Sequence, residues 1–499
     1  MFMPTDHVPD VLILGGGNAA LCAAIAARET GADVLVIDRA PAEQAGGSSR
    51  YATGTVRIAY DGVDSIRKLV PELGDEEAAE TDFGSYTVES YLEDLGRLSG
   101  YRADPDLADT VASESYDVTR WMAGHGLRFL PMYGRQAFSQ SGHRTFWGGC
   151  VVEVVGGGAA LVDGLTRAAI RLGVQVRYET AALRLIETDG RVRGAVVHGP
   201  DGAKLKIQAG AVMIATGGFD ANAEWRARYL GPNWDLARSR GSSFTVGDGI
   251  AMGLAAGAAP AGHWSGSHAV AWESNAPEAP SITESSGMSR HSYPLGIMVN
   301  SRGQRFVDEG ADFRNYTYGL YGGAVLAQPG QVAWQIFDAK VIPLLREEYR
   351  GRAVTKVVAD RLDDLARRMD GVDAVALLRT VGEFNAAIRA DIPFHAAVKD
   401  GRHTSGLAVP KSNWANTLDT GPFEAFGVTC GVSFTYGGLR IDADGRVLDA
   451  TRRPIPGLFA AGATAGGLFY GNSASGSSLT SGSVLGRRAG RAAAQAALA

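Results

Sequence analysis

The stretch Val11-Leu12-Ile13-Leu14-Gly15-Gly16-Gly17-Asn18-Ala19-Ala20 decides how this chain begins to fold. Its first four residues form a short apolar run that ends at a glycine, a pattern typical of a buried parallel strand. The segment from Asn18 to Thr30 is rich in alanine and predicts a helix, which Gly31 would end. Val34 to Ile37 repeats the apolar run and predicts a second buried strand. Together these segments predict a βαβ unit.

The glycine-rich turn of this unit has the spacing of a phosphate cradle. Gly15, Gly17 and Ala20 fit the pattern G-x-G-x-x-A, in which the glycines allow a tight turn and a close backbone approach to a pyrophosphate. The helix N-terminus adds free N–H groups and partial positive charge. Asp38 ends the second strand about 20 residues further on, where a carboxylate accepts hydrogen bonds from a ribose. The unit therefore predicts a dinucleotide site; the alternative is a glycine-rich turn that binds no ligand.

Length and composition limit the class of protein. The 499 residues suggest two domains, and 45% hydrophobic with 20% charged residues allow a large core. A net charge of −6 without a basic block argues against a nucleic-acid partner. The cysteines, Cys22, Cys150 and Cys430, are widely spaced and form neither a metal pattern nor a disulfide framework, which fits a reducing cytoplasm. Residues 1–10 lack a signal-peptide pattern, and no run of about 18 apolar residues predicts a membrane span.

The order of the remaining segments predicts an interrupted domain. Further strands are expected at 174–178, 193–197, 211–216 and 458–461, helices at 76–98, 105–125 and 156–172, a Gly/Ser loop at 45–54, and a hairpin turn at Asp189-Gly190. Residues 262–432 are richer in Trp, Tyr, His, Ser and Asn. We therefore predict an α/β fold: a Rossmann-like dinucleotide-binding domain of residues 1–261 and 433–499, interrupted by an inserted second domain of residues 262–432.

FAD is the expected dinucleotide because two further strand–turn segments, one far downstream of the first βαβ unit and one near the C-terminus, would let both ends of the chain touch the cofactor. These are Ala215-Thr216-Gly217-Gly218-Phe219 and Phe459-Ala460-Ala461-Gly462-Ala463, which suit FAD in an extended pose. Gly156-Gly157-Gly158 also opens a helix, so a second nucleotide site there is the alternative. Glu153 in the preceding strand argues against it, because a charged residue suits a buried parallel strand poorly.

These segments, in this order, resemble the FAD-dependent fumarate reductase/succinate dehydrogenase flavoprotein superfamily, which also contains 3-ketosteroid Δ1-dehydrogenases. The resemblance is also carried by Gly46-Gly47-Ser48-Ser49, Gly247-Asp248-Gly249, Asn300 to Val307, Tyr436 to Asp442 and Gly457 to Gly462. Further segments are similar to tricarballylate dehydrogenases: Gly46 to Arg50, Phe306 to Glu309, Asp312 to Tyr318, Pro410 to Ala415 and Val428 to Gly431. In this superfamily an FAD-binding domain is interrupted by a capping domain that closes over the flavin ring. The resemblance therefore implies a Rossmann-like FAD-binding domain of residues 1–261 and 433–499 and an α+β capping domain of residues 262–432.

The resemblance implies a set of FAD-contacting residues. They are Gly15, Gly17, Asn18, Ala19, Ala20, Asp38, Arg39, Gly46, Gly47, Ser48, Ser49, Ala182, Ala215, Thr216, Gly217, Gly247, Asp248, Gly462, Ser475, Ser478 and Leu479. The C-terminal helix that opens at 476–479 would point its amides at the N1/O2 edge of the flavin, where negative charge builds on reduction. The loop at 46–54 has no histidine for covalent attachment, so we expect non-covalent FAD.

The implied reaction is desaturation of a polycarboxylate, of the tricarballylate to cis-aconitate type, with hydride passing to flavin N5 and a proton to an arginine-based relay. Arg314 is the proton-transfer candidate; a carboxylate anchor or an ordinary ion-pair arginine are the alternatives, because arginine is a poor base at its usual pKa. His268 is expected to bind a substrate carboxylate, with His263 as its competitor. Asp308 and Glu309 would extend a proton path or simply begin a helix.

Two departures from the fumarate reductases argue against fumarate or succinate as substrate. Ser433-Phe434-Thr435-Tyr436 stands where those enzymes carry a carboxylate-binding histidine, and the loop 471–476 lacks their substrate-binding arginine. Thr435 and Tyr436 are nevertheless expected at the site. A tricarboxylate needs compensating positive charge. Besides Arg314, the candidates for that charge are Arg290, Lys411 and the pair His143-Arg144, each of which alone is more often a solvated charge.

Electrons must leave through a separate acceptor, since the chain has no cysteine cluster for iron–sulfur and no C-x-x-C-H for haem. We expect a membrane iron–sulfur, cytochrome or quinone-linked partner, and a cytoplasmic enzyme that docks at the inner membrane through it. Two other functions stay open: a flavin desaturase or ene-reductase acting on a neutral cyclic ketone, and a flavin-binding protein for assembly or sensing. An apolar pocket with a tyrosine base would favour the ketone, and a cluster of Arg, Lys and His the polycarboxylate.

Overall fold

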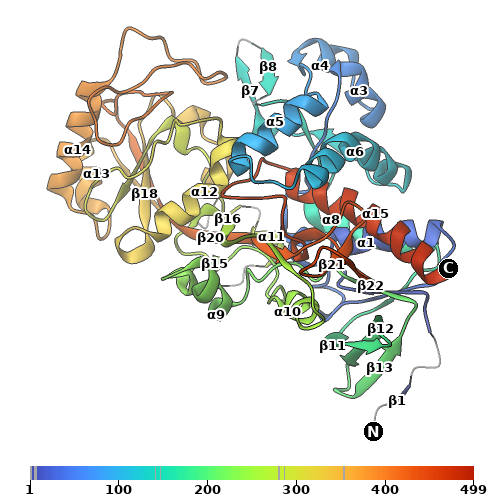
Figure 1. The fold of residues 1–499 in the computed structure, drawn as a ribbon. Coiled ribbons are helices and arrows are strands. Elements are labelled where there is room, and N and C mark those ends of the chain that lie inside the picture. Colours follow the sequence, from blue (N-terminus) through green and yellow to red (C-terminus); the bar gives the residue numbers. More distant parts are fainter. Residues whose placement is uncertain are drawn as a thin grey trace.

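A computed structural model describes residues 3–4, 8–140, 142–146, 148–278, 281–285, 287–351 and 354–499. At the centre of the described residues lies a six-stranded sheet built from both ends of the chain (Figure 1). Its strand order is β10 (Gln175–Arg177), β3 (Val34–Ile37), β2 (Val11–Leu14), β14 (Ala211–Ile214), β22 (Pro454–Ala460) and β21 (Arg446–Leu448). The first five run parallel and β21 is antiparallel. Strands β2, β3 and β14 are buried along their whole length, as their continuous apolar runs predict.

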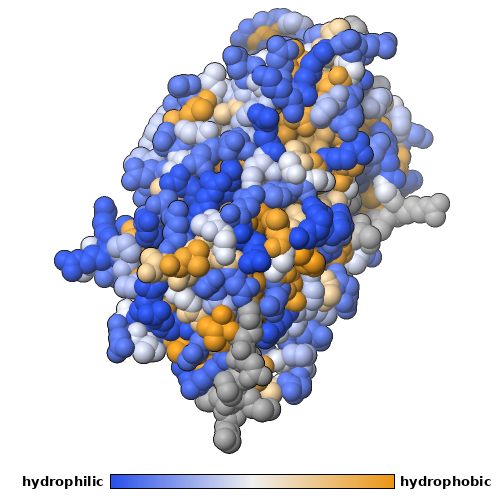
Figure 2. Space-filling model, turned by 90° about the vertical axis from the view of Figure 1, so that its right-hand side faces the viewer, coloured by the Kyte–Doolittle hydropathy of each residue, from blue (hydrophilic) through white to orange (hydrophobic). Residues whose placement is uncertain are grey.

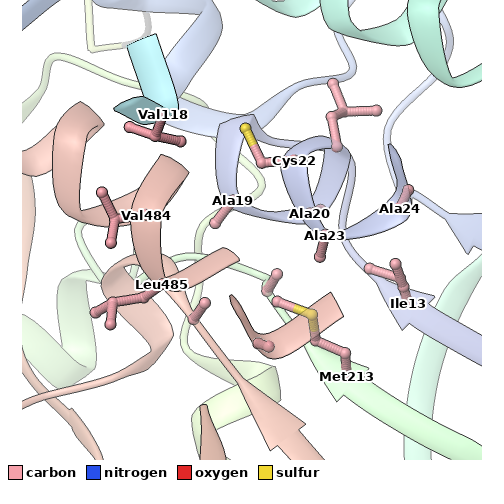
Figure 3. Packing of buried hydrophobic residues seen from close by; sticks show 14 of the residues in the cluster. Ile13, Ala19, Ala20, Cys22, Ala23, Ala24, Val118, Met213, Val484 and Leu485 are labelled. Carbon is pink, nitrogen blue, oxygen red and sulfur yellow. The ribbon is translucent and has the colours of Figure 1, made fainter. Parts of the chain in front are cut away.

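Helix α1 (Asn18–Glu29) and the C-terminal helix α15 (Ser477–Leu498) pack face to face beside this sheet. Figure 3 shows the contact, with Ala19 and Ala23 of α1 facing the helix that carries Val484 and Leu485. Small residues permit the close approach. A Cβ atom on Gly490 would lie 2.1 Å from the carbonyl oxygen of Ala23. This packing places the N-terminus of α15 beside that of α1.

We expect Gly490→Ala to lower the free energy of unfolding by about 1–3 kcal/mol, because the new methyl group meets backbone that cannot move aside without separating the helices. The matched control is Gly382→Ala on α14 (Ala374–Ala387), where an added Cβ meets no atom within 4 Å. That control should change stability by less than about 1 kcal/mol and in the stabilising direction. Thermal unfolding of the two variants decides; equal midpoints would contradict the proposed close packing.

The second large sheet is organised around the long strand β20 (Phe423–Leu439). Its partners are β15 (Arg238–Ser239), β16 (Pro260–Glu273), β18 (Ala333–Phe337), which in turn pairs with β17 (Ile297–Asn300), and β19 (Lys356–Ala359). Helices α12 (Arg314–Leu326), α13 (Leu362–Arg368) and α14 lie around it, at the left in Figure 1. The strands of this sheet lie between residues 238 and 439 and so extend past both predicted domain boundaries, at 262 and 432. The boundaries themselves stay a prediction.

Smaller elements surround the two sheets. One sheet has the strand order β1 (Met3–Pro4), β13 (Lys204–Gln208), β12 (Arg191–His198) and β11 (Ala181–Thr188). A second sheet has the order β4 (Thr55–Arg57), β9 (Val151–Val154) and β6 (Phe129–Pro131). A third has the order β5 (Thr81–Asp82), β8 (His143–Phe146) and β7 (Ala137–Gln140). The other α-helices are α2 (Gly47–Tyr51), α3 (Gly62–Leu69), α4 (Asp75–Ala79), α5 (Val88–Ser99), α6 (Pro105–Gly124), α7 (Tyr133–Gln136), α8 (Gly157–Arg171), α9 (Ala223–Trp225), α10 (Asp248–Ala255) and α11 (Ile282–Ser285). One-turn 3-10 segments lie at Trp234–Leu236, Tyr293–Leu295, Pro329–Gln331, Ile342–Leu344, Glu347–Tyr349 and Gly462–Thr464, and a π-turn at Arg226–Leu230.

The predicted α/β class is confirmed, but several local predictions are wrong. The segment 76–98 is not one helix, because β5 separates α4 from α5. The Gly/Ser loop at 45–54 contains α2. The Asp189-Gly190 turn joins β12 to β11, a strand the sequence analysis did not predict, whereas β10 pairs with β3.

The glycines at 156–158 have a packing role. Glu153 lies on β9, which pairs antiparallel with β4 and β6. These glycines therefore do not follow a parallel strand, as the glycines of the first βαβ unit do. A Cβ on Gly158 would lie 2.2 Å from the carbonyl oxygen of Ser49, so the start of α8 packs directly against α2.

The outer surface shows no continuous apolar band on the face drawn in Figure 2, where hydrophobic residues form small groups separated by hydrophilic ones. Among the described helices, none is long and apolar enough to cross a membrane.

Candidate functional site

A continuous cavity extends from the first βαβ unit to helix α12, which lies beside the second large sheet. Most of the predicted FAD-contacting residues line it. They are Gly15, Gly17, Asn18, Ala19, Asp38, Arg39, Gly46, Gly47, Ser48, Ser49, Ala182, Ala215, Thr216, Gly217, Asp248, Gly462, Ser475, Ser478 and Leu479. Of the predicted catalytic residues, Arg314, His268, Thr435 and Tyr436 also line it. Segments from both ends and the middle of the chain therefore meet in one space.

The first βα turn forms a backbone cradle at one end of the cavity. Gly15 has φ +108°, and a Cβ there would lie 2.4 Å from the carbonyl oxygen of Ala215. The hydroxyl of Ser49 accepts the backbone N–H of Asn18 at 3.2 Å, so α2 supports the start of α1. The Asn18 side-chain amide donates to the carbonyl of Leu479 at 2.9 Å, which joins α1 to α15. An anion seated here meets backbone N–H groups without side chains in the way.

Asp38 lines the cavity at the end of β3, where an adenosine ribose is expected. Its carboxylate accepts the N–H of Ala40 at 2.9 Å and that of Gly46 at 3.4 Å. Burial raises the pKa of Asp38, and these N–H groups oppose that shift. Arg39, which also lines the cavity, pairs with Asp248 of the same lining at 2.8 Å.

Ala20 and Gly247 lie outside the cavity lining. Ala20 is fully buried in the core beneath the cradle. Gly247 precedes α10 with φ +85°, and a Cβ there would lie 2.7 Å from the ring of Trp225. Both positions require a small residue for packing, so we place them in support of the cradle rather than in contact with a ligand.

Arg314 is the first residue of α12 and is almost fully buried. Its guanidinium group donates to the carbonyl oxygen of Arg135 and lies over the ring of Tyr318, 5.2 Å from the centroid. Its Nε has no partner among the described residues. Burial lowers the pKa of Arg314, and the charge of Arg135 adds to the shift. The positive end of the helix dipole disfavours a cation at this position as well.

The start of α12 is tied to the loop before α15. The Ser475 N–H donates to the carbonyl of Asn315 at 3.0 Å, and the Asn472 side chain donates to the carbonyl of Tyr316 at 2.5 Å. The Thr435 hydroxyl accepts the N–H of Phe219 at 3.2 Å. The Tyr436 hydroxyl lies 3.5 Å from that of Ser473. These contacts connect the end of the cavity near Arg314 to the loop that precedes the C-terminal helix α15.

His268 lies on β16 between the rings of Phe434 and Tyr318, with centroid separations of 5.2 and 4.7 Å. It is buried, and its Nδ1 has no partner among the described residues. Burial lowers the pKa of His268 to about 3, and the charge of Arg240 adds to the shift. The ring is therefore neutral near pH 7 and can still donate one hydrogen bond to a carboxylate.

The low pKa of His268 makes a prediction for stability. An unfolded histidine binds a proton below about pH 6.5, whereas the native ring does so only near pH 3, so the free energy of unfolding falls as the pH falls through this window. When the pH falls from 7 to 5, we expect the free energy of unfolding to decrease by about 2 kcal/mol less in His268→Gln than in the wild type. The control is the exposed His143→Gln, and denaturant titrations at a fixed FAD concentration measure both. Equal pH slopes for wild type and H268Q would contradict the buried neutral ring.

Arg135, Arg240, His291 and Tyr318 are among the cavity-lining residues that the sequence analysis did not assign to the site. Arg135 lies on α7 and Arg240 directly follows β15, far from each other in the chain. His291 is buried, its Nε2 has no partner among the described residues, and burial together with four nearby arginines lowers its pKa well below the usual value. No local pattern marks these residues; only the tertiary fold brings them together.

Other predicted charges lie outside the cavity lining. Arg290 forms a buried ion pair with Glu273 at 2.6 Å, and the Lys411 ammonium donates to the carbonyls of Pro294 and Gly296 at 2.7 and 2.8 Å. Both charges are already compensated by the protein, which is the physical reason to remove them from the substrate site. The remaining candidates have partners of their own. His263 accepts the N–H of Gly471, Arg144 lies over the ring of Tyr133, Asp308 accepts Ser412, and Glu309 pairs with Arg305.

The cavity has the features that FAD requires. A Cβ on Gly15 or Gly16 would lie within 2.6 Å of the Ala215 carbonyl oxygen or the Asp38 carboxylate. The start of α15 lines the same cavity, and Thr216 presents a buried hydroxyl that has no partner among the described residues. A parallel sheet with such a cradle at the ends of β2 and β3 is the architecture of a dinucleotide-binding protein.

Comparison with known families specifies the dinucleotide. Residues 10–479 match the sequence family described as "FAD binding domain". The chain belongs to this family, the fumarate reductase/succinate dehydrogenase flavoproteins, and is an FAD-dependent oxidoreductase that acts on CH–CH groups.

Relatives in this family act on different substrates. The chain is 30% identical over 503 residues to a fumarate reductase (cytochrome) from Shewanella frigidimarina, covering 99% of this chain and 78% of that protein. It is 27% identical to a 3-oxosteroid 1-dehydrogenase from Mycolicibacterium smegmatis, covering 93% of each. The fold is similar to the open conformation of a flavocytochrome c3 fumarate reductase, with a TM-score of 0.72 at 28% identity, covering 99% of this chain and 79% of that one. The narrower likeness to tricarballylate dehydrogenases is not shown by these relatives.

Proposed function

We propose that the enzyme desaturates a polycarboxylate of the tricarballylate type and holds its FAD non-covalently. The observation that carries this proposal is the basic end of the cavity, where Arg135, Arg240 and Arg314 face the same space. Guanidinium groups are the side chains best suited to carboxylates, and a cluster of them in a buried site costs free energy unless an anion is bound.

The residues of the chain have separate tasks in this reaction. Bound FAD supplies the acceptor for the hydride that leaves one substrate carbon. Arg314 exchanges the proton of the neighbouring carbon, and its lowered pKa makes the neutral guanidine, the form that can accept a proton, more available than in an exposed arginine. His268, as a neutral ring, orients a substrate carboxylate. Thr435 and Tyr436 join β20 to the segment after β14 and to the loop before α15, through Phe219 and Ser473.

The surrounding architecture supports this assignment. We propose that residues 262–432 act as a cap over the cavity, because Arg314 on α12 and His268 on β16 line it. We propose non-covalent FAD because α2, which lies at the cavity where covalent members carry a histidine, reads Gly-Ser-Ser-Arg-Tyr. A separate electron acceptor is proposed because the three cysteines are buried and unpaired. We further propose a cytoplasmic location, with docking on a membrane acceptor.

A neutral cyclic ketone is the second candidate. It is favoured by the relative named as a 3-oxosteroid 1-dehydrogenase and by Tyr318 in the cavity lining. The guanidinium groups of Arg240 and Arg314 disfavour it, since the Nε of each has no partner among the described residues and a neutral ketone brings no counter-charge to them.

An aerobic dye-reduction assay tests the proposal. The purified holoenzyme is supplied with tricarballylate or with a 3-ketosteroid, and bleaching of the dye is followed. Turnover with tricarballylate alone is the expected result. Turnover with the 3-ketosteroid alone would replace the polycarboxylate, and no turnover with either would favour an assembly or sensing role.

A further inference from the structure

Asp220 is a buried carboxylate in the lining of the cavity, and the proposed reaction gives it no task. It follows Phe219 in the segment after β14 and is only 1% exposed. Its Oδ2 accepts the hydroxyl of Thr245 at 2.8 Å and that of Ser48 at 3.3 Å. Its Oδ1 is buried and has no hydrogen-bond partner among the described residues. Because an unpaired buried carboxylate oxygen is costly, its presence beside a ligand site points to a function.

Close packing fixes Asp220 next to the space that FAD occupies. A Cβ on Gly241 would lie 2.4 Å from the Ser48 hydroxyl oxygen and 3.4 Å from Oδ2 of Asp220. A Cβ on Gly218 would lie 2.3 Å from the Thr435 hydroxyl oxygen and 3.5 Å from Oδ1 of Asp220. Gly218, Gly241 and Ser48 all line the cavity. Ser48, a predicted FAD contact, therefore belongs both to the cavity lining and to the hydrogen bonds of the carboxylate.

The surroundings of Asp220 compensate its charge only in part. Burial raises the pKa of Asp220 to about 7, while hydrogen bonds from Thr245 and Ser48 and the charge of Arg226 oppose the shift. Arg226 is directed to the backbone, since its Nη1 donates to the carbonyl oxygen of Asp220 at 2.6 Å. Asp220 is therefore present in both protonation states near neutral pH.

Other ionisable side chains lie on the segments that contact Asp220. They are Arg50 and Tyr51 on α2, Arg228 and Tyr229 on the π-turn, Arg240 beside Gly241, and Tyr436 beside Thr435. Arg50 pairs with Asp163 at 2.7 Å, and Arg240 donates to the hydroxyl of Ser433 at 3.2 Å. These two cations thus have partners other than the Asp220 carboxylate.

The two protonation states of Asp220 act differently on the cavity. An ionised carboxylate only accepts hydrogen bonds, so the Ser48 hydroxyl donates its single hydrogen to it. A protonated carboxyl group can itself donate to Ser48, which frees the Ser48 hydrogen for an acceptor in the cavity. Protonation also removes one negative charge from the cavity lining. Protonation of Asp220 and the arrival of negative charge in the cavity therefore favour each other.

We propose that Asp220, acting through Ser48, couples reduction of the bound FAD to the uptake of one proton and so sets the pH dependence of the flavin potential. Reduction by a hydride brings two electrons and one proton to the flavin and adds one negative charge. Asp220, ionised beforehand, then binds one proton from the solvent and offsets that charge. Asp220 is a positioning residue and exchanges no proton with the substrate. The inference rests on FAD as the cofactor and is independent of the proposed substrate.

The midpoint potential of the holoenzyme, measured against reference dyes from pH 5 to 9, tests this coupling. Above about pH 7 the potential of the wild type should fall more steeply with pH than that of D220N. One additional proton per two electrons changes the equilibrium tenfold per pH unit, which is about 30 mV for a two-electron couple. Below that pH, where Asp220 is protonated in both redox states, the two slopes should agree. Equal slopes for wild type and D220N over the whole range would overturn the proposal.

The matched control is D235N, an exposed carboxylate in the 3-10 turn Trp234–Leu236 that lies outside the cavity lining. This variant should keep the slope of the wild type. A slope lowered in D235N as much as in D220N would show that the effect is not specific to Asp220 and would overturn the proposal.

A second measurement needs no variant. Electrochemically reduced methyl viologen, which delivers electrons without protons, is added anaerobically to unbuffered wild-type holoenzyme, and a pH indicator counts the protons bound. At about pH 8 we expect more than one proton per two electrons; one proton or fewer would overturn the proposal even if D220N fails to retain FAD. Neither measurement contains a substrate, so both results stand whether or not tricarballylate is turned over.

Discussion

Replacing Arg314 by alanine is expected to lower kcat by about 1,000-fold or more while the FAD content of the purified protein stays unchanged. Loss of a general acid or base typically costs about 10²- to 10⁴-fold. FAD is retained because the guanidinium contacts Arg135 and Tyr318, whereas the cradle is formed by the β2–α1 turn. Steady-state kinetics with tricarballylate, together with the flavin absorbance per chain, measure both quantities.

A second variant separates proton transfer from anchoring. In R314K the positive charge remains, so a residue that only anchors a carboxylate would give a raised KM with kcat nearly intact. A proton-transfer residue would give a large fall in kcat, because a shorter side chain misplaces the exchanging atom. R302A is the matched control, an exposed arginine in the turn after β17, and should behave as the wild type. A kcat close to the wild-type value in R314A would remove Arg314 from proton transfer.

Replacing Gly15 by alanine is expected to give a protein that purifies with little or no FAD. The residue has φ +108°, where an L side chain is strained, and its Cβ would lie 2.4 Å from the Ala215 carbonyl oxygen. Relief of this clash moves the end of β2 away from β14 and deforms the cradle. A deformation that costs about 3 kcal/mol of binding weakens FAD by about 100-fold.

Gly31→Ala is the control for backbone strain alone. Gly31 has φ +99°, similar to Gly15, but a Cβ there meets no atom within 4 Å, and it follows the far end of α1. This variant should lose about 1 kcal/mol of stability and keep its FAD. Equal FAD contents in G15A and G31A, read from the flavin absorbance, would contradict the role of the Gly15 turn in cofactor binding.

The sequence was most informative where one local pattern determines both structure and chemistry. The run from Val11 to Ala20, with Asp38 beyond it, predicted the strands and helix of the first unit to within one residue, because a buried parallel strand and a close-packed helix each demand a particular residue type. The prediction of a hairpin partner for β12 failed because Asp189-Gly190 specifies a turn but not the strand before it.

The basic end of the cavity was much less predictable. Arg135, Arg240 and Arg314 lie more than 70 residues apart in sequence. The pairing of β15 with β20, and the hydrogen bonds from Arg314 and Arg346 to backbone carbonyls of α7, bring them together. Arg290 and Lys411 looked equally suitable in the sequence. They are compensated inside the protein by Glu273 and by backbone carbonyls, which depend on contacts that a linear pattern does not reveal.

The measurement that tests the account most directly is an anaerobic titration of the purified holoenzyme, followed through its flavin absorbance. The account predicts a yellow protein whose flavin is bleached stoichiometrically by tricarballylate and not by a 3-ketosteroid. A protein that takes up no flavin when it is supplied, or whose flavin is bleached by the ketone and not by the tricarboxylate, would contradict the account.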